Sequence, residues 1–202
     1  MKQLIERQLK NTQPPADPVG EALARLPAGV AETWFNRPLV SAAVLFPLID
    51  RGAKLHVLLT QRTEHLDDHP GQISFPGGRA EPSDTGLRHT ALRETEEEIG
   101  LAAESIAIAG YLEPLAVITG FAVVPVVGFV AGDARFTLDP FEVADLFEVP
   151  LDFFLDDANH QRIERTVRGF TMPFSEYHFE EHRIWGATAM IIRDLTNLLK
   201  NR

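Results

Sequence analysis

The chain contains no cysteine among its 202 residues. This absence excludes disulfide bonds, a catalytic thiolate and a zinc site with cysteine ligands. The histidines do not take over that role, because His65, His69 and His89 lack the spacing of a zinc site. Internal repeats and low-complexity tracts are also absent from the sequence. We therefore expect an ordinary globular fold without covalent cross-links.

Long apolar runs are equally scarce. The longest, residues 121–131, contains Pro125 and Gly128 and is too short to span a bilayer. The N-terminal segment MKQLIERQLKNTQPP predicts a short amphipathic helix and a proline-rich linker, without the apolar core of a signal peptide. We therefore expect no membrane partner and a cytoplasmic location.

Basic side chains are outnumbered by acidic ones. Lys and Arg total 19 against 29 Asp and Glu, which gives a formal net charge of -10. No basic stripe is visible, so we expect no nucleic acid partner. A small anionic substrate is still compatible, because a bound metal ion can invert the local field. With 45% hydrophobic and 24% charged residues, the composition is that of one globular domain with a full core.

Strands outnumber helices in the pattern of apolar residues. A hairpin is expected around the turn 50–52, between strands at 41–49 and 55–60. Further strands are expected at 106–118, 121–130, 146–149, 162–168 and 176–184. Helices are expected at 19–26, 85–99, 151–155 and 187–199. This order favours the α/β (α+β) class, a mixed β-sheet sandwiched between α-helices, after a peripheral lead-in at residues 1–37.

The most unusual segment is an acidic run at the end of the helix expected at 85–99. Four of the five residues from 94 to 98 are glutamates. A helix C-terminus carries partial negative charge, so each of them is unfavourable by about 0.3–1 kcal/mol. The like charges of Glu94 and Glu98, four residues apart, add about 0.2–0.5 kcal/mol of repulsion. A bound cation is the compensation we expect, because local rules are broken mainly at functional sites.

The helical period sorts these glutamates. At about 100° per residue, Glu94, Glu97 and Glu98 share an arc that borders the buried face, whereas Glu96 points to solvent. Three carboxylates on one rigid element suit Mg²⁺ or Mn²⁺, which prefer oxygen ligands. We expect Asp84 to be the N-cap of this helix and Gly100 its C-terminal stop.

This segment resembles the signature of the Nudix hydrolase family. The motif is a glycine, a spacer, an acid, a second spacer and Arg-Glu-apolar-x-Glu-Glu-x-Gly-apolar. Asp84 stands where glutamate is usual, and Thr95 stands where an apolar residue is usual. The matching residues are Gly78, Arg93, Glu94, Glu97, Glu98, Gly100 and Leu101. The resemblance implies a Nudix-type mixed sheet between helices, in a hydrolase domain at residues 38–202.

A second resemblance lies upstream. The runs 58–62 and 75–78, with Gly71 between them, are similar to the signature of the coenzyme A pyrophosphatase branch of that family. Eight residues separate Asp84 from Arg93, one more than is usual in the family, and this branch carries both the aspartate and the extra residue. Two positions depart from the signature: Asp67 stands where the branch has arginine, and Thr63 replaces a small residue.

The resemblance also implies roles for individual residues. Glu94, Glu97 and Glu98, with the backbone carbonyl of Gly78, are implied as metal ligands, and one of the acids as the base. Arg93 is implied to pair with a carboxylate, and Gly77 and Gly78 to let the backbone approach the phosphates closely. Arg62 is implied to contact a phosphate, and Glu142 is a possible extra acid.

Three functions remain open at this point. The first is a metal-dependent hydrolase that splits the diphosphate of coenzyme A or acyl-coenzyme A into adenosine 3′,5′-bisphosphate and phosphopantetheine or its acyl derivative. The second is a Nudix pyrophosphatase acting on another nucleoside diphosphate derivative, such as ADP-ribose or NADH. The third is a non-catalytic domain that senses such a ligand. The sequence leaves the choice between a monomer and a homodimer open.

Overall fold

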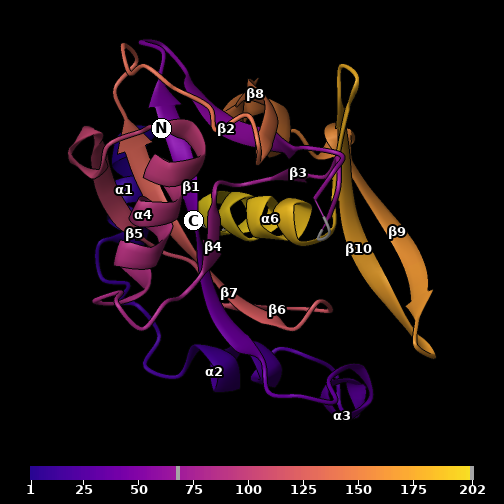
Figure 1. The fold of residues 1–202 in the computed structure, drawn as a ribbon. Helices are drawn as coiled ribbons and strands as arrows, with labels where there is room; N and C mark the ends of the chain where they lie inside the picture. The colour runs from indigo at the N-terminus through magenta and orange to yellow at the C-terminus, as the bar shows by residue number, and fades with distance from the viewer. Residues whose placement is uncertain (67–68, 201–202) are drawn as a thin grey trace.

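The computed structural model describes residues 1–66 and 69–200 (Figure 1). Its α-helices are α1 (Lys2–Leu9), α2 (Pro18–Ala24), α3 (Val30–Trp34), α4 (Leu87–Ile99), α5 (Leu151–Leu155) and α6 (Gly186–Lys200). Its strands are β1 (Val40–Asp50), β2 (Leu55–Arg62), β3 (Ile73–Ser74), β4 (Gly77–Arg79), β5 (Ile106–Tyr111), β6 (Leu115–Val117), β7 (Phe121–Val130), β8 (Val143–Pro150), β9 (His160–Val167), β10 (Phe170–Phe179) and β11 (His182–Trp185). Short 3₁₀ turns lie at Ala103–Ser105 and Asp157–Asn159.

The larger sheet is mixed. Its central path runs β3-β2-β1-β7-β5, with β4 paired to β1, β6 to β7 and β8 to β2. Strands β1 and β7 are parallel over ten registered positions, from Val40 opposite Phe121 to Ile49 opposite Val130. The other strand pairings described in this sheet are antiparallel. The expected hairpin is present, because β1 and β2 pair through Leu48 opposite Val57.

The alternation of side chains along β1 builds a core on each face of this sheet. Phe46 and Leu48 belong to the cluster that includes α1 and α6, whereas Leu45 and Ile49 belong to the cluster formed with α4. Successive strand residues point to opposite faces, so one strand serves both cores. The α/β (α+β) class with a mixed sheet between helices is thereby confirmed.

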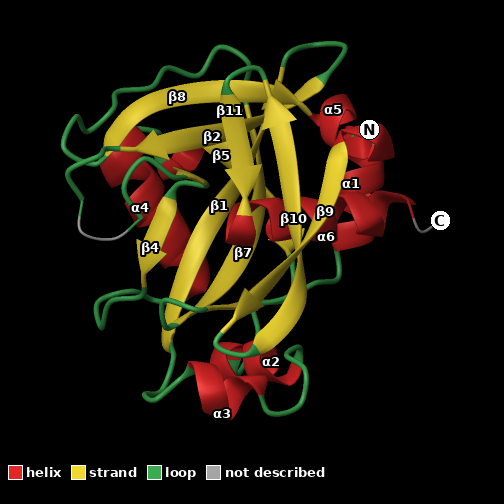
Figure 2. Cartoon of the chain, turned by 90° about the vertical axis from the view of Figure 1, so that its right-hand side faces the viewer, coloured by secondary structure: helices red, strands yellow, loops and turns green. Residues whose placement is uncertain are grey.

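A second, three-stranded antiparallel sheet has the order β11-β10-β9. Figure 1 shows α6 between the larger sheet and this smaller one, and Figure 2 shows the β9–β10 hairpin reaching toward α2 and α3. Helix α6 packs against β10 and β11. Residues of both sheets and of α6 line one cavity.

Two expected strands are each broken in two. The strand expected at 106–118 consists of β5 and β6, which leave the sheet register between them at residues 112–114. The strand expected at 176–184 divides at Glu180, which adopts the left-handed conformation with φ of 51° between β10 and β11. A turn residue other than glycine with positive φ is uncommon, so the pattern of apolar residues did not reveal this hairpin.

The lead-in is not peripheral, which corrects the expectation from the sequence. Ile5 and Leu9 of α1 are 0% and 1% exposed and belong to the main core. Ala22 of α2 is also fully buried, in a smaller cluster with residues of β6 and β7. The domain boundary at residue 37 stays a prediction.

None of the helices described in residues 1–66 and 69–200 combines the length and apolar character that crossing a bilayer requires.

Candidate active site

Helix α4 ends as the sequence predicted. Gly100 adopts the left-handed conformation, with φ of 66° and ψ of 18°, and its N–H donates to the Glu96 carbonyl at 2.9 Å. The backbone N–H groups of Thr137 and Asp139 donate to the carbonyls of Ile99 and Glu98 at 2.8 and 2.9 Å. The loop before β8 therefore satisfies the free carbonyls of the helix end and holds it in place.

Glu98 is the buried acid of the cluster. Its exposed fraction is 5%, and one carboxylate oxygen accepts a hydrogen bond from the Gly77 N–H at 3.2 Å. Burial raises the pKa of Glu98 to about 8, although the Gly77 N–H and the Arg62 guanidinium, 4.0 Å away, oppose the rise. The charges of Glu142 and Glu94 add to the rise. The site thus holds a carboxyl group whose ionised form lacks full compensation.

Glu94 lies against the strand that carries the two glycines. A Cβ atom built on Gly78 would stand 2.5 Å from the Glu94 carboxyl carbon, so any side chain there would displace this acid. Burial raises the pKa of Glu94, while the adjacent Arg93 lowers it. The main chain of Gly78 and the carboxylate of Glu94 are therefore packed together as one surface.

Gly77 is required for a different reason. Its φ is +150°, and a Cβ atom at this position would lie 2.4 Å from the Ala43 carbonyl oxygen and 2.5 Å from the Val44 Cα. Both contacts are with backbone that is held in the register of β1 and β4. Gly77 and Gly78 thus belong to β4, which packs between β1 and α4.

Asp84 does not cap α4, which corrects the expectation from the sequence. The helix starts at Leu87, and Gly86 occupies the N-cap position without a side-chain hydrogen bond. Asp84 instead accepts two hydrogen bonds from Arg93, Nε to Oδ1 at 3.0 Å and Nη2 to Oδ2 at 3.2 Å. It also accepts from Thr90 and pairs with His89, each at 2.8 Å. The Arg93 guanidinium holds the pKa of Asp84 well below its usual range.

Arg93 joins Asp84 to the acidic cluster. Its Nη1 lies 2.9 Å from an oxygen of Glu94 and 2.9 Å from an oxygen of Glu97, and its Nη2 donates to the Arg79 carbonyl at 3.1 Å. The partner that the sequence predicted for Arg93 is therefore present several times over. Because Asp84 and the Arg79 carbonyl hold the guanidinium in place, Arg93 fixes the positions of Glu94 and Glu97.

The remaining glutamates of the helix are outside the buried cluster. Glu96 is exposed, as its helical phase predicted, and Glu97 is 59% exposed with its carboxylate on Arg93. Within residues 1–66 and 69–200, no three Asp, Glu or His side chains lie close enough together to hold a metal ion. Glu94 and Glu98 face β4 together, and Glu97 stands aside on the arginine.

Arg62 and Glu142 reach the cluster from β2 and from the loop before β8. The Arg62 guanidinium is 4.0 Å from Glu98, and the charge of Glu142 raises the pKa of both Glu94 and Glu98. The carbonyl of Glu142 accepts from the Thr63 N–H at 3.0 Å, which ties the two segments together. The fold therefore assembles most of the residues singled out in the sequence, whereas Asp67 lies outside the described residues.

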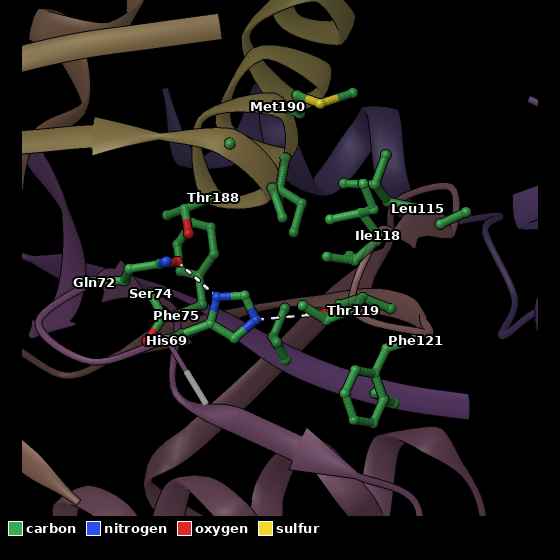
Figure 3. A pocket seen from close by; sticks show the side chains of 18 of the residues that line it. His69, Gln72, Ser74, Phe75, Leu115, Ile118, Thr119, Phe121, Thr188 and Met190 are labelled. Atoms are coloured by element: carbon green, nitrogen blue, oxygen red, sulfur yellow. Dashed lines mark hydrogen bonds between the residues drawn. The ribbon is translucent and has the colours of Figure 1, made fainter. Parts of the chain in front are cut away.

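A cavity of about 460 Å³ lies beside the cluster. Arg62, Gly77 and Gly78 line one part of it, and further wall residues come from α2, α3, β6, β7, β10 and α6. Figure 3 shows His69 within it, with hydrogen bonds to Gln72 at 2.8 Å and to Thr119 at 3.4 Å. The volume is that of a small-molecule site.

His69 and the apolar wall were missed by sequence reasoning. The His69 backbone is left-handed with φ of 58°, an uncommon conformation that concentrates at functional sites. No spacing in the sequence marks it, because its partner Thr119 is 50 residues away. The apolar wall was likewise hidden, since its segments are distant in the chain.

Comparisons with known proteins identify the family of this chain. The family model described as "NUDIX domain" matches residues 38–169. The "Uncharacterized Nudix hydrolase NudL" of Yersinia pestis (strain Pestoides F) is 42% identical over 162 residues, which cover 80% of this chain and 81% of that protein. The protein of the same name from Yersinia pseudotuberculosis serotype O:1b (strain IP 31758) is also 42% identical, with 80% and 81% coverage.

A solved structure agrees at the level of the fold. DR0079 from Deinococcus radiodurans has a TM-score of 0.50 at 13% identity, over 76% of this chain and 81% of that chain, and this similarity shows the fold alone. The family model spans more than half of the present sequence, and the NudL proteins match most of its length. This chain therefore belongs to the Nudix family and is a Nudix pyrophosphohydrolase.

Proposed function

We propose that the substrate is coenzyme A or an acyl-coenzyme A, and that hydrolysis of its diphosphate gives adenosine 3′,5′-bisphosphate and phosphopantetheine or its acyl derivative. Gly77 and Gly78 carry this proposal, because they line a ligand-sized, largely apolar cavity, and the Gly77 N–H donates to the buried acid Glu98. A diphosphate at the glycines would have room beside it for a long substituent. The resemblance of residues 58–62 and 75–78 to the coenzyme A branch supports the same substrate.

A divalent cation fits the donors of this site. Glu94, Glu98 and the Gly78 carbonyl would hold Mg²⁺ or Mn²⁺, and Glu97 would join them on leaving Arg93; all offer hard oxygen ligands. A cation would also offset the cost of a carboxylate buried at a helix C-terminus. When bound, such an ion supplies charge neutralisation at the diphosphate and a more acidic water for attack on phosphorus.

The chain's own residues position the reactants. Gly77 and Gly78 present main chain without side chains, so phosphate groups can approach closely. Arg62 adds a guanidinium on the cavity wall beside Glu98, suited to a phosphate oxygen. Arg93 acts through Glu94 and Glu97, which makes it a positioning residue. Glu142 is the extra acid of this proposal, because its charge acts on both buried glutamates.

A substrate screen tests the proposal. Purified protein with Mg²⁺ or Mn²⁺ would be offered coenzyme A, ADP-ribose, NADH and dinucleoside polyphosphates, with released phosphomonoesters measured after phosphatase treatment. We expect the highest kcat/KM for coenzyme A or one of its acyl derivatives. A clear preference for ADP-ribose or NADH would replace coenzyme A by the second candidate, and no turnover of any of them with either metal would overturn both.

A further inference from the structure

The cavity beside the glycines is apolar over most of its wall. Trp34 of α3, Phe121 of β7 and Met190 of α6 line it, and so does Ile118 in the turn between β6 and β7. Ile118 is 36% exposed, so part of this apolar wall is open to water. Figure 3 shows Leu115, Ile118, Phe121 and Met190 around the same open space.

This apolar space is continuous with the candidate active site. Arg62, Gly77 and Gly78 line the same cavity as the apolar residues of α6 and β10. A molecule bound with its diphosphate at the glycines therefore has part of its structure inside an apolar wall. A free nucleotide or sugar would leave that wall facing water, at a cost proportional to the apolar area.

Both internal methionines of the chain belong to this wall. The sequence has three methionines, and Met172 and Met190 both line the cavity, from β10 and α6. Methionine is unbranched and flexible, and it adapts to ligands of different shape. This composition suits a flexible chain better than a rigid planar ring.

We propose that the cavity binds the linear alkyl part of an acyl chain carried on the non-nucleoside half of the diphosphate substrate. The inference rests on the proposed function for the position of the diphosphate, and it deepens that function by assigning the acyl group its own subsite. The subsite is built by the lead-in helices, the β6–β7 turn, the β9–β10 hairpin and α6. It makes acyl-coenzyme A with a medium-length chain a better substrate than coenzyme A itself.

A charge placed in the wall tests this subsite. Met190→Glu introduces a carboxylate into the apolar cavity, whereas Asn197→Glu places the same group at an exposed position of α6. In wild type, kcat/KM for decanoyl-coenzyme A should exceed that for coenzyme A by at least about tenfold. Met190→Glu should abolish this preference, because a carboxylate in the wall disfavours the apolar chain. Asn197→Glu should change neither value.

A binding measurement separates failure of the subsite from failure of the proposed function. The chain has two tryptophans, Trp34 and Trp185, and both line the cavity, so intrinsic fluorescence reports its occupation. Decyl phosphate, titrated without metal, should cause a saturable change in wild type and in Asn197→Glu but not in Met190→Glu.

Each contrary result has a distinct meaning. Equal kcat/KM for coenzyme A and decanoyl-coenzyme A, a preference that survives Met190→Glu, or the lack of any fluorescence change in wild type would overturn the acyl subsite. A saturable fluorescence change in a protein that cleaves neither coenzyme A nor decanoyl-coenzyme A would instead support the subsite and overturn the proposed function.

Discussion

Glu98 carries the largest electrostatic cost of any single residue in the candidate site. Its carboxyl group is 5% exposed, at the negative end of α4, with a pKa of about 8. The helical period placed Glu98 beside Glu94 and Glu97, but it did not distinguish the buried acid from the exposed one. That distinction depends on β4 and on the loop before β8, whose contacts with α4 lie far apart in the sequence.

Glu98→Gln should lower kcat at least about a hundredfold, because it removes a proposed metal ligand and a candidate base. The metal-free variant should nevertheless be more stable than wild type near pH 8. The ordinary pKa of glutamate, 4.5, rises to about 8 in the folded chain, so the unfolded chain loses its proton first and wild-type stability falls as pH rises between these values. Thermal melts in EDTA from pH 5 to pH 8 measure this, and parallel curves for the two proteins would contradict it.

Glu96 provides the matched control on the same helix. Its side chain is exposed, and the ion pairs that Arg93 makes on this helix are with Glu94 and Glu97 instead. Glu96→Gln should therefore keep kcat/KM within about threefold of wild type, as surface substitutions usually do. A loss as large as that of Glu98→Gln in the same steady-state assay would show that the helical assignment of roles is wrong.

Among the elements, α4 is attached to the loop that follows β4 through Asp84 and Arg93, and to β4 itself through the Arg79 carbonyl. The acid and the arginine are nine residues apart and bind by two hydrogen bonds. At the other end of α4, Gly100 terminates the helix and the loop before β8 satisfies its carbonyls. The sequence identified Gly100 as the stop because a left-handed glycine has a clear signal. It misassigned Asp84, because N-capping and pairing with a distant arginine call for the same type of residue.

Asp84→Asn should destabilise the fold by about 3 kcal/mol, because it leaves the buried side of Arg93 without its charged partner. The Asp84 side chain is 2% exposed, and Arg93 holds its pKa well below the usual range. Its contribution is therefore present above the ordinary aspartate pKa and is lost as pH falls below it. Urea unfolding at pH 7 and pH 3 measures both effects, with the exposed Asp133→Asn as control. A deficit that stays equal at the two pH values would contradict the ion-pair explanation.

At the scale of the whole molecule, the lead-in belongs to the core and to the ligand cavity. The alternation of apolar residues in the strands was enough to predict the central sheet and its flanking helices. The packing of α1 was not predictable, because the three apolar residues of this short helix do not reveal what they contact. The cavity was hidden for a similar reason, since its wall joins segments from α2 to α6.

Leu9→Ala should destabilise the protein by about 3 kcal/mol, the usual effect of a cavity in a packed core. Leu9 is 1% exposed and packs with the main core. Glu6→Ala, at an exposed position of the same helix, should stay within about 0.5 kcal/mol of wild type. Chemical denaturation of the full chain checks both. Equal stability of the two variants would return α1 to the role of a peripheral segment.

The proposed reaction is attack of water on a phosphorus atom of the coenzyme A diphosphate. Hydrolysis of coenzyme A in ¹⁸O-labelled water with Mg²⁺ or Mn²⁺, followed by mass spectrometry of the products, tests it most directly. We expect adenosine 3′,5′-bisphosphate and phosphopantetheine in equal amounts, with one labelled oxygen on the phosphate of only one of them, and product formation at least about a hundredfold slower with Glu98→Gln. Release of inorganic phosphate from the 3′ position, or intact coenzyme A with either metal, would contradict it.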